Sequence, residues 1–313
     1  MLKYLCFYLL VLPVIVVGQD YPRDTSYTIQ GSYLKYLNKF PFIEIVNPDT
    51  LADINLAKNV VYQTIGNRNL HLDLFSPNRS GIRFKSAIIM IHGGGWVSGD
   101  KSHMVPMAVE LVKRGYIAVA VEYRLSPEAQ YPAAIFDIKT AIRWVKEHAD
   151  SLQVDLDKIA LLGCSSGGQL ASLVGFSSGV KKLEGITDKQ KFSSDVQAII
   201  NMDGVLAFHH PDSQEGRVAG LWLGGLYGEA TSQWEEASAL SHAGKRDPPT
   251  LFIHSQYPRF HAGREDVIKI MNEHGIHTEV KFISNSPHTF WLFHPWFDPT
   301  VQYVSSFLTH IFQ

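Results

Sequence analysis

Cysteine is scarce in this sequence, with two among 313 residues, which excludes a small scaffold held by disulfides. An excess of charge of one sign is also lacking, because 28 lysine and arginine residues stand against 30 aspartate and glutamate residues. The net charge of -2 offers no field suited to a polyanion, so nucleic acid is not an expected partner. Glycine follows no regular period and 45% of the residues are hydrophobic, which excludes collagen-like and disordered chains and favours one large domain.

The amino-terminal residues 1–18 have a basic start at Lys3, then an apolar run, then small residues before Gln19. This order is typical of a secretory signal peptide, and the run is short for a membrane span of about 20 residues. We therefore expect cleavage and export to a periplasm or the exterior, with no membrane attachment of the mature chain. Cys164 would then remain alone, as a small buried residue without redox chemistry.

The rest of the chain divides into an arm and a main domain. Residues 19–58 are polar and dotted with tyrosines, which predicts an N-terminal arm lying over the body. Within residues 59–313, short apolar runs alternate with segments of helical periodicity; the runs are 87–91, 117–121, 159–162, 196–200, 251–254 and 278–282. This alternation predicts an α/β fold with a doubly wound, mostly parallel sheet. Residues 205–246 break the alternation and predict a small cap.

A serine occupies a sharp predicted turn. The segment Gly163-Cys164-Ser165-Ser166-Gly167 lies between a predicted strand and a predicted helix. Glycines permit a tight turn that lifts the serine hydroxyl above the edge of the sheet, where it can act as a nucleophile. The alternative is a glycine-rich connection that merely turns the chain.

A second glycine-rich motif, His-Gly-Gly-Gly-Trp at residues 92–96, follows the predicted strand 87–91. Acyl transfer needs N–H donors aimed at a developing oxyanion, and glycines let the backbone supply them. We expect the donors to be the N–H groups of Gly94, Gly95 and Ser166. The alternative, a phosphate-binding loop, requires Lys-Ser or Lys-Thr after the glycines, and this sequence does not have it.

The general base is expected after the last predicted strand, where His288 follows residues 278–282. A neutral imidazole can take the serine proton and return it to the leaving group. Other histidines, His254, His261 and His294, remain alternatives, but their positions fit this role less well.

The acid that orients the histidine is harder to identify. Residues 254–260, after the penultimate strand, contain no carboxylate. Asp203, at the end of the preceding strand, is our favoured candidate, and Asp266 or Glu265 in the next helix is the alternative. If Asp203 is not the acid, it would simply form an Asp-Gly turn, and Asp266 would simply be a carboxylate at the N-terminus of a helix.

These motifs together resemble the α/β-hydrolase superfamily, and in particular its esterases with a His-Gly-Gly-Gly-Trp oxyanion motif that act on plant cell-wall carbohydrates. The segments 202–211 and 258–264 are similar to those of bacterial polysaccharide esterases. The resemblance implies removal of acetyl or methyl esters from pectin or xylan through a Ser-His-acid triad, with no metal or organic cofactor. A peptidase of the same fold and a non-catalytic binding protein are the alternatives.

Four further residues are expected to contact the substrate: Trp96, Arg259, His261 and Arg264. A guanidinium group matches a uronate carboxylate in a bidentate manner. The alternative for the basic cluster is a set of salt bridges to Glu265 and Asp266.

Overall fold

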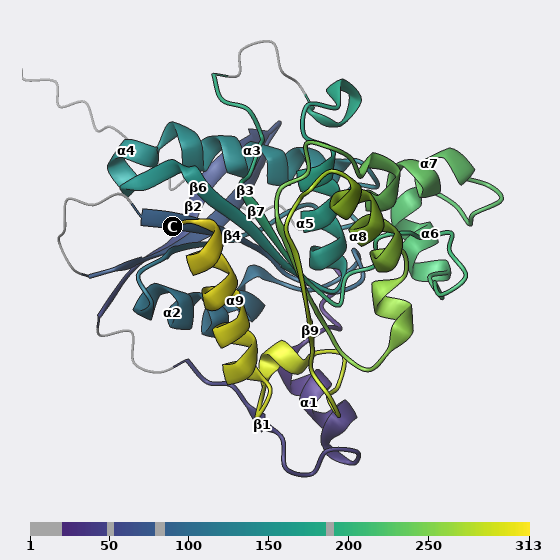
Figure 1. The fold of residues 1–313 in the computed structure, drawn as a ribbon, viewed down its shortest axis with the longest axis horizontal. Helices are drawn as coiled ribbons and strands as arrows, with labels where there is room; N and C mark the ends of the chain where they lie inside the picture. Colours follow the sequence, from purple (N-terminus) through teal and green to yellow (C-terminus); the bar gives the residue numbers. More distant parts are fainter. Residues whose placement is uncertain (1–20, 49–52, 79–84, 186–190) are drawn as a thin grey trace, which may run out of the picture.

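The computed structural model describes residues 21–48, 53–78, 85–185 and 191–313, so the expected signal segment lies outside the described residues. The described part contains an eight-stranded sheet in the order β2-β3-β5-β4-β6-β7-β8-β9 (Figure 1). In that order the strands are β2 (Ile54–Ile65), β3 (Arg68–Pro77), β5 (Ile117–Val121), β4 (Lys85–Ile91), β6 (Val154–Cys164), β7 (Ala198–Met202), β8 (Thr250–His254) and β9 (Thr278–Phe282). Within this sheet, as described, only the β2-β3 and β3-β5 pairings are antiparallel, which confirms the predicted mostly parallel α/β sheet.

Helices cover both faces of this sheet (Figure 1). One face packs against α3 (Ala133–Glu147), α5 (Ser166–Phe176) and α8 (Arg264–Glu273), and the other against α2 (Val105–Lys113) and α9 (Phe297–Ile311). The short helix α4 (Ala149–Leu152) follows α3.

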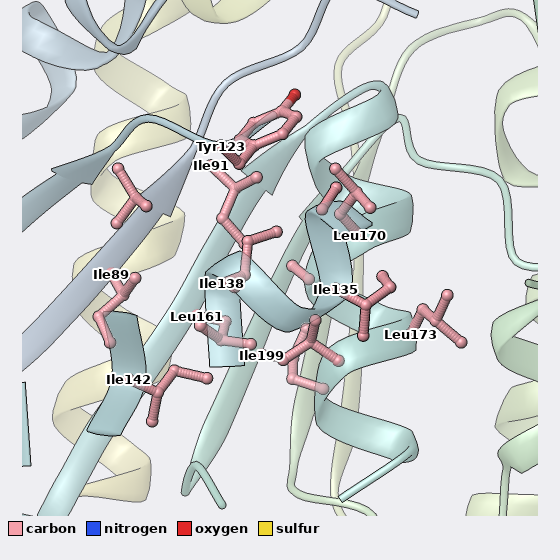
Figure 2. Packing of buried hydrophobic residues seen from close by; sticks show 14 of the residues in the cluster. Ile89, Ile91, Tyr123, Ile135, Ile138, Ile142, Leu161, Leu170, Leu173 and Ile199 are labelled. Atoms are coloured by element: carbon pink, nitrogen blue, oxygen red, sulfur yellow. The ribbon is translucent and has the colours of Figure 1, made fainter. Parts of the chain in front are cut away.

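Strand β4 shows why both faces are covered. Successive side chains of a strand point to opposite faces, and Ile89 and Ile91 belong to one core cluster while Ile88 and Met90 belong to the other. Figure 2 shows the first cluster, in which the isoleucines of β4 lie near those of α3 and the leucines of α5. Each strand of this kind must be apolar on both faces, which explains its continuous apolar sequence.

The N-terminal arm contains regular structure that the sequence did not predict. Helix α1 (Ile29–Leu37) begins after Thr28, whose hydroxyl oxygen accepts a hydrogen bond from the Gly31 N–H. Strand β1 (Glu44–Ile45) pairs with β10 (Phe293–His294), and the Phe40 ring lies 5.3 Å from the Trp296 ring. The arm is therefore packed against the segment that follows His288.

The first strand of the large sheet, β2, begins at Ile54, inside the residues 19–58 that were expected to form the arm. Its pairing with β3 is interrupted by a register shift between Ala57 and Val60. Such an irregularity breaks the alternation of apolar and polar residues and hides the start of the strand from a pattern-based prediction.

Residues 205–246 contain α6 (Arg217–Leu223) and α7 (Thr231–Glu236), joined to the body by buried Trp222 and Trp234. No helix in the described ranges has both the length and the apolar character needed to cross a membrane.

Candidate active site

Ser165 lies at the junction of β6 and α5 in a strained backbone conformation. Its φ of 55° and ψ of -122° are unfavourable for a residue with a side chain, and its N–H donates to the Met202 carbonyl at 2.7 Å. The flanking glycines are required sterically: a Cβ on Gly163 would collide with the Gly167 carbonyl oxygen, and one on Gly167 with the Ile91 carbonyl oxygen. The turn predicted from the sequence is thus a tight strand-to-helix elbow.

The structure brings His288 against this serine. The His288 Nε2 atom lies 2.8 Å from Ser165 Oγ, and Nδ1 lies 2.8 Å from Asp203 Oδ2. An ionised carboxylate only accepts hydrogen bonds, so Nδ1–H donates to Asp203, and Nε2 is left to accept the Ser165 hydroxyl. The Phe260 ring stacks on the imidazole with centroids 3.4 Å apart and planes 10° from parallel.

Of the carboxylates considered from the sequence, Asp203 is the one next to His288. It follows β7, is 2% exposed, and accepts hydrogen bonds from the backbone N–H and the hydroxyl of Ser255. Asp266 instead pairs with His210 at 3.1 Å, and Glu265 pairs with Arg264. Sequence reasoning missed Ser255, although it stands directly after β8, where an acid was sought.

The glycine-rich loop after β4 lines the cavity next to Ser165 and His288. Gly94, Gly95 and Ser166 line one cavity together with Ser165 and His288. In the described part of the chain, the N–H groups of Gly94, Gly95 and Ser166 donate to no other group. Gly94 has a φ of 132°, and a Cβ there would collide with the Ser98 carbonyl oxygen.

His92, the first residue of this loop, supports it from behind. Burial lowers the pKa of His92 to about 4, so the ring is neutral. It stacks on Tyr123 with ring centroids 4.5 Å apart, and the Tyr123 hydroxyl donates to the His92 carbonyl at 2.9 Å. The motif therefore begins with a histidine that packs and does not titrate near neutral pH.

The cavity above Ser165 has a volume of about 810 Å³. Its walls include Tyr27, Lys35 and Tyr36 of the arm, and Glu215 and Arg217 of the cap. No local pattern in the sequence indicates that the arm returns to this site, so these contributions could not be predicted.

The expected substrate contacts are separated in space. Trp96 lines the cavity, stacks on Trp222 at 5.2 Å, and donates from Nε1 to Gln169 Oε1 at 2.9 Å. Arg259 also lines this cavity, whereas His261 and Arg264 line a separate space of about 10 Å³.

The reason for this separation is the 3-10 turn Pro258–His261, in which residues two apart point in different directions. Burial and the nearby Arg264 charge lower the pKa of His261 to about 4. The salt bridge expected as an alternative is present for Glu265, 2.6 Å from Arg264, whereas Asp266 pairs with His210.

Within the ranges that the structure describes, no group of three His, Cys, Asp or Glu side chains is placed to hold a metal ion. Cys164 is a buried free thiol, and burial raises its pKa well above the ordinary value.

The chain is similar in sequence and in fold to known proteins. The family model BD-FAE matches residues 72–259. The probable carboxylic ester hydrolase LipM of Mycobacterium tuberculosis is 27% identical over 237 residues, which are 73% of this chain and 52% of that protein. Esterase LipI of the same organism is 43% identical over 88 residues, 28% of each chain. The chain spans about half the length of several of the curated relatives it matches.

Solved structures of esterases have a similar fold. A thermophilic esterase, Est2 of Thermogutta terrifontis, superposes with a TM-score of 0.68 at 26% identity, over 84% of this chain and 94% of that one. A truncated carbohydrate esterase from gut microbiota shares the fold, with a TM-score of 0.71 at 23% identity over 84% of this chain and 99% of that one. Because this family model matches residues 72–259, more than half of the chain, the chain belongs to the BD-FAE family of α/β-hydrolase esterases.

Proposed function

We propose that this protein is a serine carboxylic-ester hydrolase. The observation that carries the proposal is the unbroken row of hydrogen bonds from Asp203 through His288 to Ser165, which ends at a cavity of about 810 Å³. A hydroxyl held against an imidazole, which is itself held by a buried carboxylate, is the arrangement that activates serine as a nucleophile.

In the proposed reaction, Ser165 Oγ attacks the ester carbonyl carbon while His288 Nε2 takes the hydroxyl proton. The resulting oxyanion accepts hydrogen bonds from the N–H groups of Gly94, Gly95 and Ser166. His288 then protonates the leaving alcohol, and an acyl-enzyme remains on Ser165. Water, activated by the same imidazole, releases the acid and restores the hydroxyl.

The proposed substrates are acetyl or methyl esters on plant cell-wall polysaccharide such as pectin or xylan, met after export of the chain. Support comes from the resemblance of residues 92–96, 202–211 and 258–264 to polysaccharide esterases. The cavity volume lies within the range of small-molecule sites, and Tyr36, Tyr257 and Phe260 offer it aromatic faces. A further support is that one protein with the same fold is described as a carbohydrate esterase from gut microbiota.

The test is Ser165→Ala with p-nitrophenyl acetate as substrate. We expect kcat to fall by about 10⁶-fold, because the triad acts as a unit. The exposed Ser232→Ala is the matched control and should keep full activity. A fluorophosphonate probe should label the wild type and not Ser165→Ala; wild-type turnover in Ser165→Ala would refute the proposal, and an unlabelled wild type would favour a non-catalytic binding protein.

The natural ester is tested separately. Acetylated xylan and methylated pectin are incubated with the enzyme, and released acetate and methanol are followed by NMR. Release of neither, despite turnover of the model ester, would refute the polysaccharide assignment.

A further inference from the structure

Positive charge gathers around the cavity above Ser165. Lys35 of α1, Arg217 of α6 and Arg259 of the turn Pro258–His261 all line it. The carboxylates that line it are Asp203, which is engaged with His288, and Glu215. The whole chain has a net charge of -2, so the excess of cations is a local property of this cavity.

Two of these cations have no carboxylate partner in the described part of the chain. Among residues 21–48, 53–78, 85–185 and 191–313, neither Lys35 nor Arg217 forms an ion pair, and both are exposed. The Lys35 Nζ atom lies 5.3 Å from the centre of the Tyr36 ring. Both side chains are thus available to an anion that enters the cavity, and a charged wall of one sign raises its local concentration.

Arg259 lies nearest to the reaction machinery. Its guanidinium carbon is 4.4 Å from the centre of the Phe260 ring, and that ring stacks on His288. Its Nε atom is buried without a hydrogen-bond partner, and its Nη2 atom is 3.5 Å from Glu215 Oε1. The side chain as a whole is 40% exposed, so an incoming carboxylate could accept hydrogen bonds from its other N–H groups.

Glu215 is the group that competes for this guanidinium. Burial raises the pKa of Glu215, and the positive charge of Arg259 only partly offsets this effect. A substrate carboxylate would be attracted by Arg259 and repelled by ionised Glu215, so the two residues should influence an anionic substrate in opposite directions.

We propose that this cavity binds esters that carry a carboxylate close to the scissile bond, such as an acetylated uronic acid, and that Arg259 recognises this carboxylate. The inference rests on the ester-hydrolase function proposed above and narrows its substrate class. Arg259 acts in binding, and the proton transfers remain with His288.

The experiment compares two substrates that differ in one group: an acetylated methyl galacturonoside, with a carboxylate, and the acetylated methyl galactoside, with a hydroxymethyl group. We expect wild-type kcat/KM to be about ten-fold higher for the acidic ester. In a second pair the charge is placed in the acyl group: p-nitrophenyl hemisuccinate carries a carboxylate there, and p-nitrophenyl butyrate does not. A preference in one pair alone supports the proposal and locates the recognised charge on the sugar or on the acyl group.

Substitutions of Arg259 and Glu215 should change the preference for the acidic ester in opposite directions. Arg259→Gln should bring the ratio of kcat/KM values for the acidic and neutral esters close to one, and Glu215→Gln should raise it severalfold. Arg114→Gln removes the same charge from a helix away from the cavity, where Arg114 pairs with Glu110, and should leave the ratio unchanged. Added salt should also reduce the wild-type ratio, because part of the attraction acts through solvent.

The outcomes separate the two proposals. Equal turnover of the neutral and acidic members of both pairs, or a preference that survives Arg259→Gln in a folded variant, would overturn the inference and leave the esterase function standing. Turnover of no ester at all would instead refute the esterase function. Glu215→Gln provides an independent readout if Arg259→Gln fails to fold.

Discussion

Ser255 donates both its backbone N–H and its hydroxyl to the carboxylate of Asp203. Ser255 follows β8 and Asp203 follows the neighbouring strand β7, so two adjacent strand ends share the buried acid. A buried carboxylate is costly unless its oxygens are hydrogen-bonded, and here Ser255 and His288 together supply three donors. Ser255 at the end of β8 thus holds the Asp203 carboxylate in place, although no carboxylate stands at that strand end.

The assignment of the acid is tested with two matched substitutions. Asp203→Asn should lower kcat for p-nitrophenyl acetate by about 10⁴-fold, because an amide stabilises the wrong histidine tautomer. Asp266→Asn should have little effect, since Asp266 pairs with His210 at the surface. Equal losses in both variants, with both folded, would argue against Asp203.

Ser255→Ala removes one of the donors to Asp203 and leaves the backbone N–H in place. A hydrogen bond to a charged group contributes about 1.5–3 kcal/mol, so we expect kcat to fall by about ten-fold or more and the melting temperature to decrease. Ser232→Ala on the exposed face of α7 is the control. Unchanged kcat in Ser255→Ala would mean that the backbone donor alone holds the acid.

Phe260 covers one face of the His288 ring, and Trp291 meets it edge-on with centroids 5.4 Å apart. An aromatic pair contributes about 0.5–1.5 kcal/mol beyond its buried area, so Phe260→Leu should reduce kcat by up to about ten-fold through looser positioning of the imidazole. KM for p-nitrophenyl acetate, a small neutral ester, should change less than kcat. Phe42→Leu alters a ring that is 54% exposed and does not line the cavity, and should not affect kcat.

Asp247 predicts a pH dependence of stability. Burial raises the pKa of Asp247 from 3.8 to about 6, so the folded state holds the proton more tightly than the unfolded state. Its contribution to stability is full below about pH 4 and is lost as the pH rises through about 6. Asp247→Asn keeps an acceptor for the Gly244 N–H and has no charge.

We therefore expect this variant to match the wild type at pH 4 and to melt at a higher temperature at pH 7, as measured by circular dichroism. A lower melting temperature than the wild type at pH 7 would contradict the expected burial cost.

The parallel strands and the elbow could be predicted because their signals are local. A strand such as β4, buried on both faces, must be apolar throughout, and the elbow must have glycine at Gly163 and Gly167. The position of Asp203 followed less directly, from the rule that adjacent parallel strands end at the same edge of the sheet.

Other parts depended on long-range packing that leaves no local pattern. The arm reaches the site because Phe40 packs on Trp296 and β1 pairs with β10, contacts that join residues about 250 positions apart. Arg259 and Arg264 look like one cluster along the chain, but Arg259 lies in the 3-10 turn and Arg264 begins α8, and the two line different cavities.

The stacking of Trp96 on Trp222 joins two parts of the molecule that are usually treated as separate. Trp96 directly follows Gly95 of the glycine-rich loop after β4, Trp222 belongs to α6 of the cap, and their ring planes are only 9° apart. The Trp96 indole is also hydrogen-bonded to Gln169 on the nucleophile helix α5. The cap is consequently coupled to the loop that we propose binds the oxyanion, and substitutions in α6 intended to alter selectivity should change turnover as well.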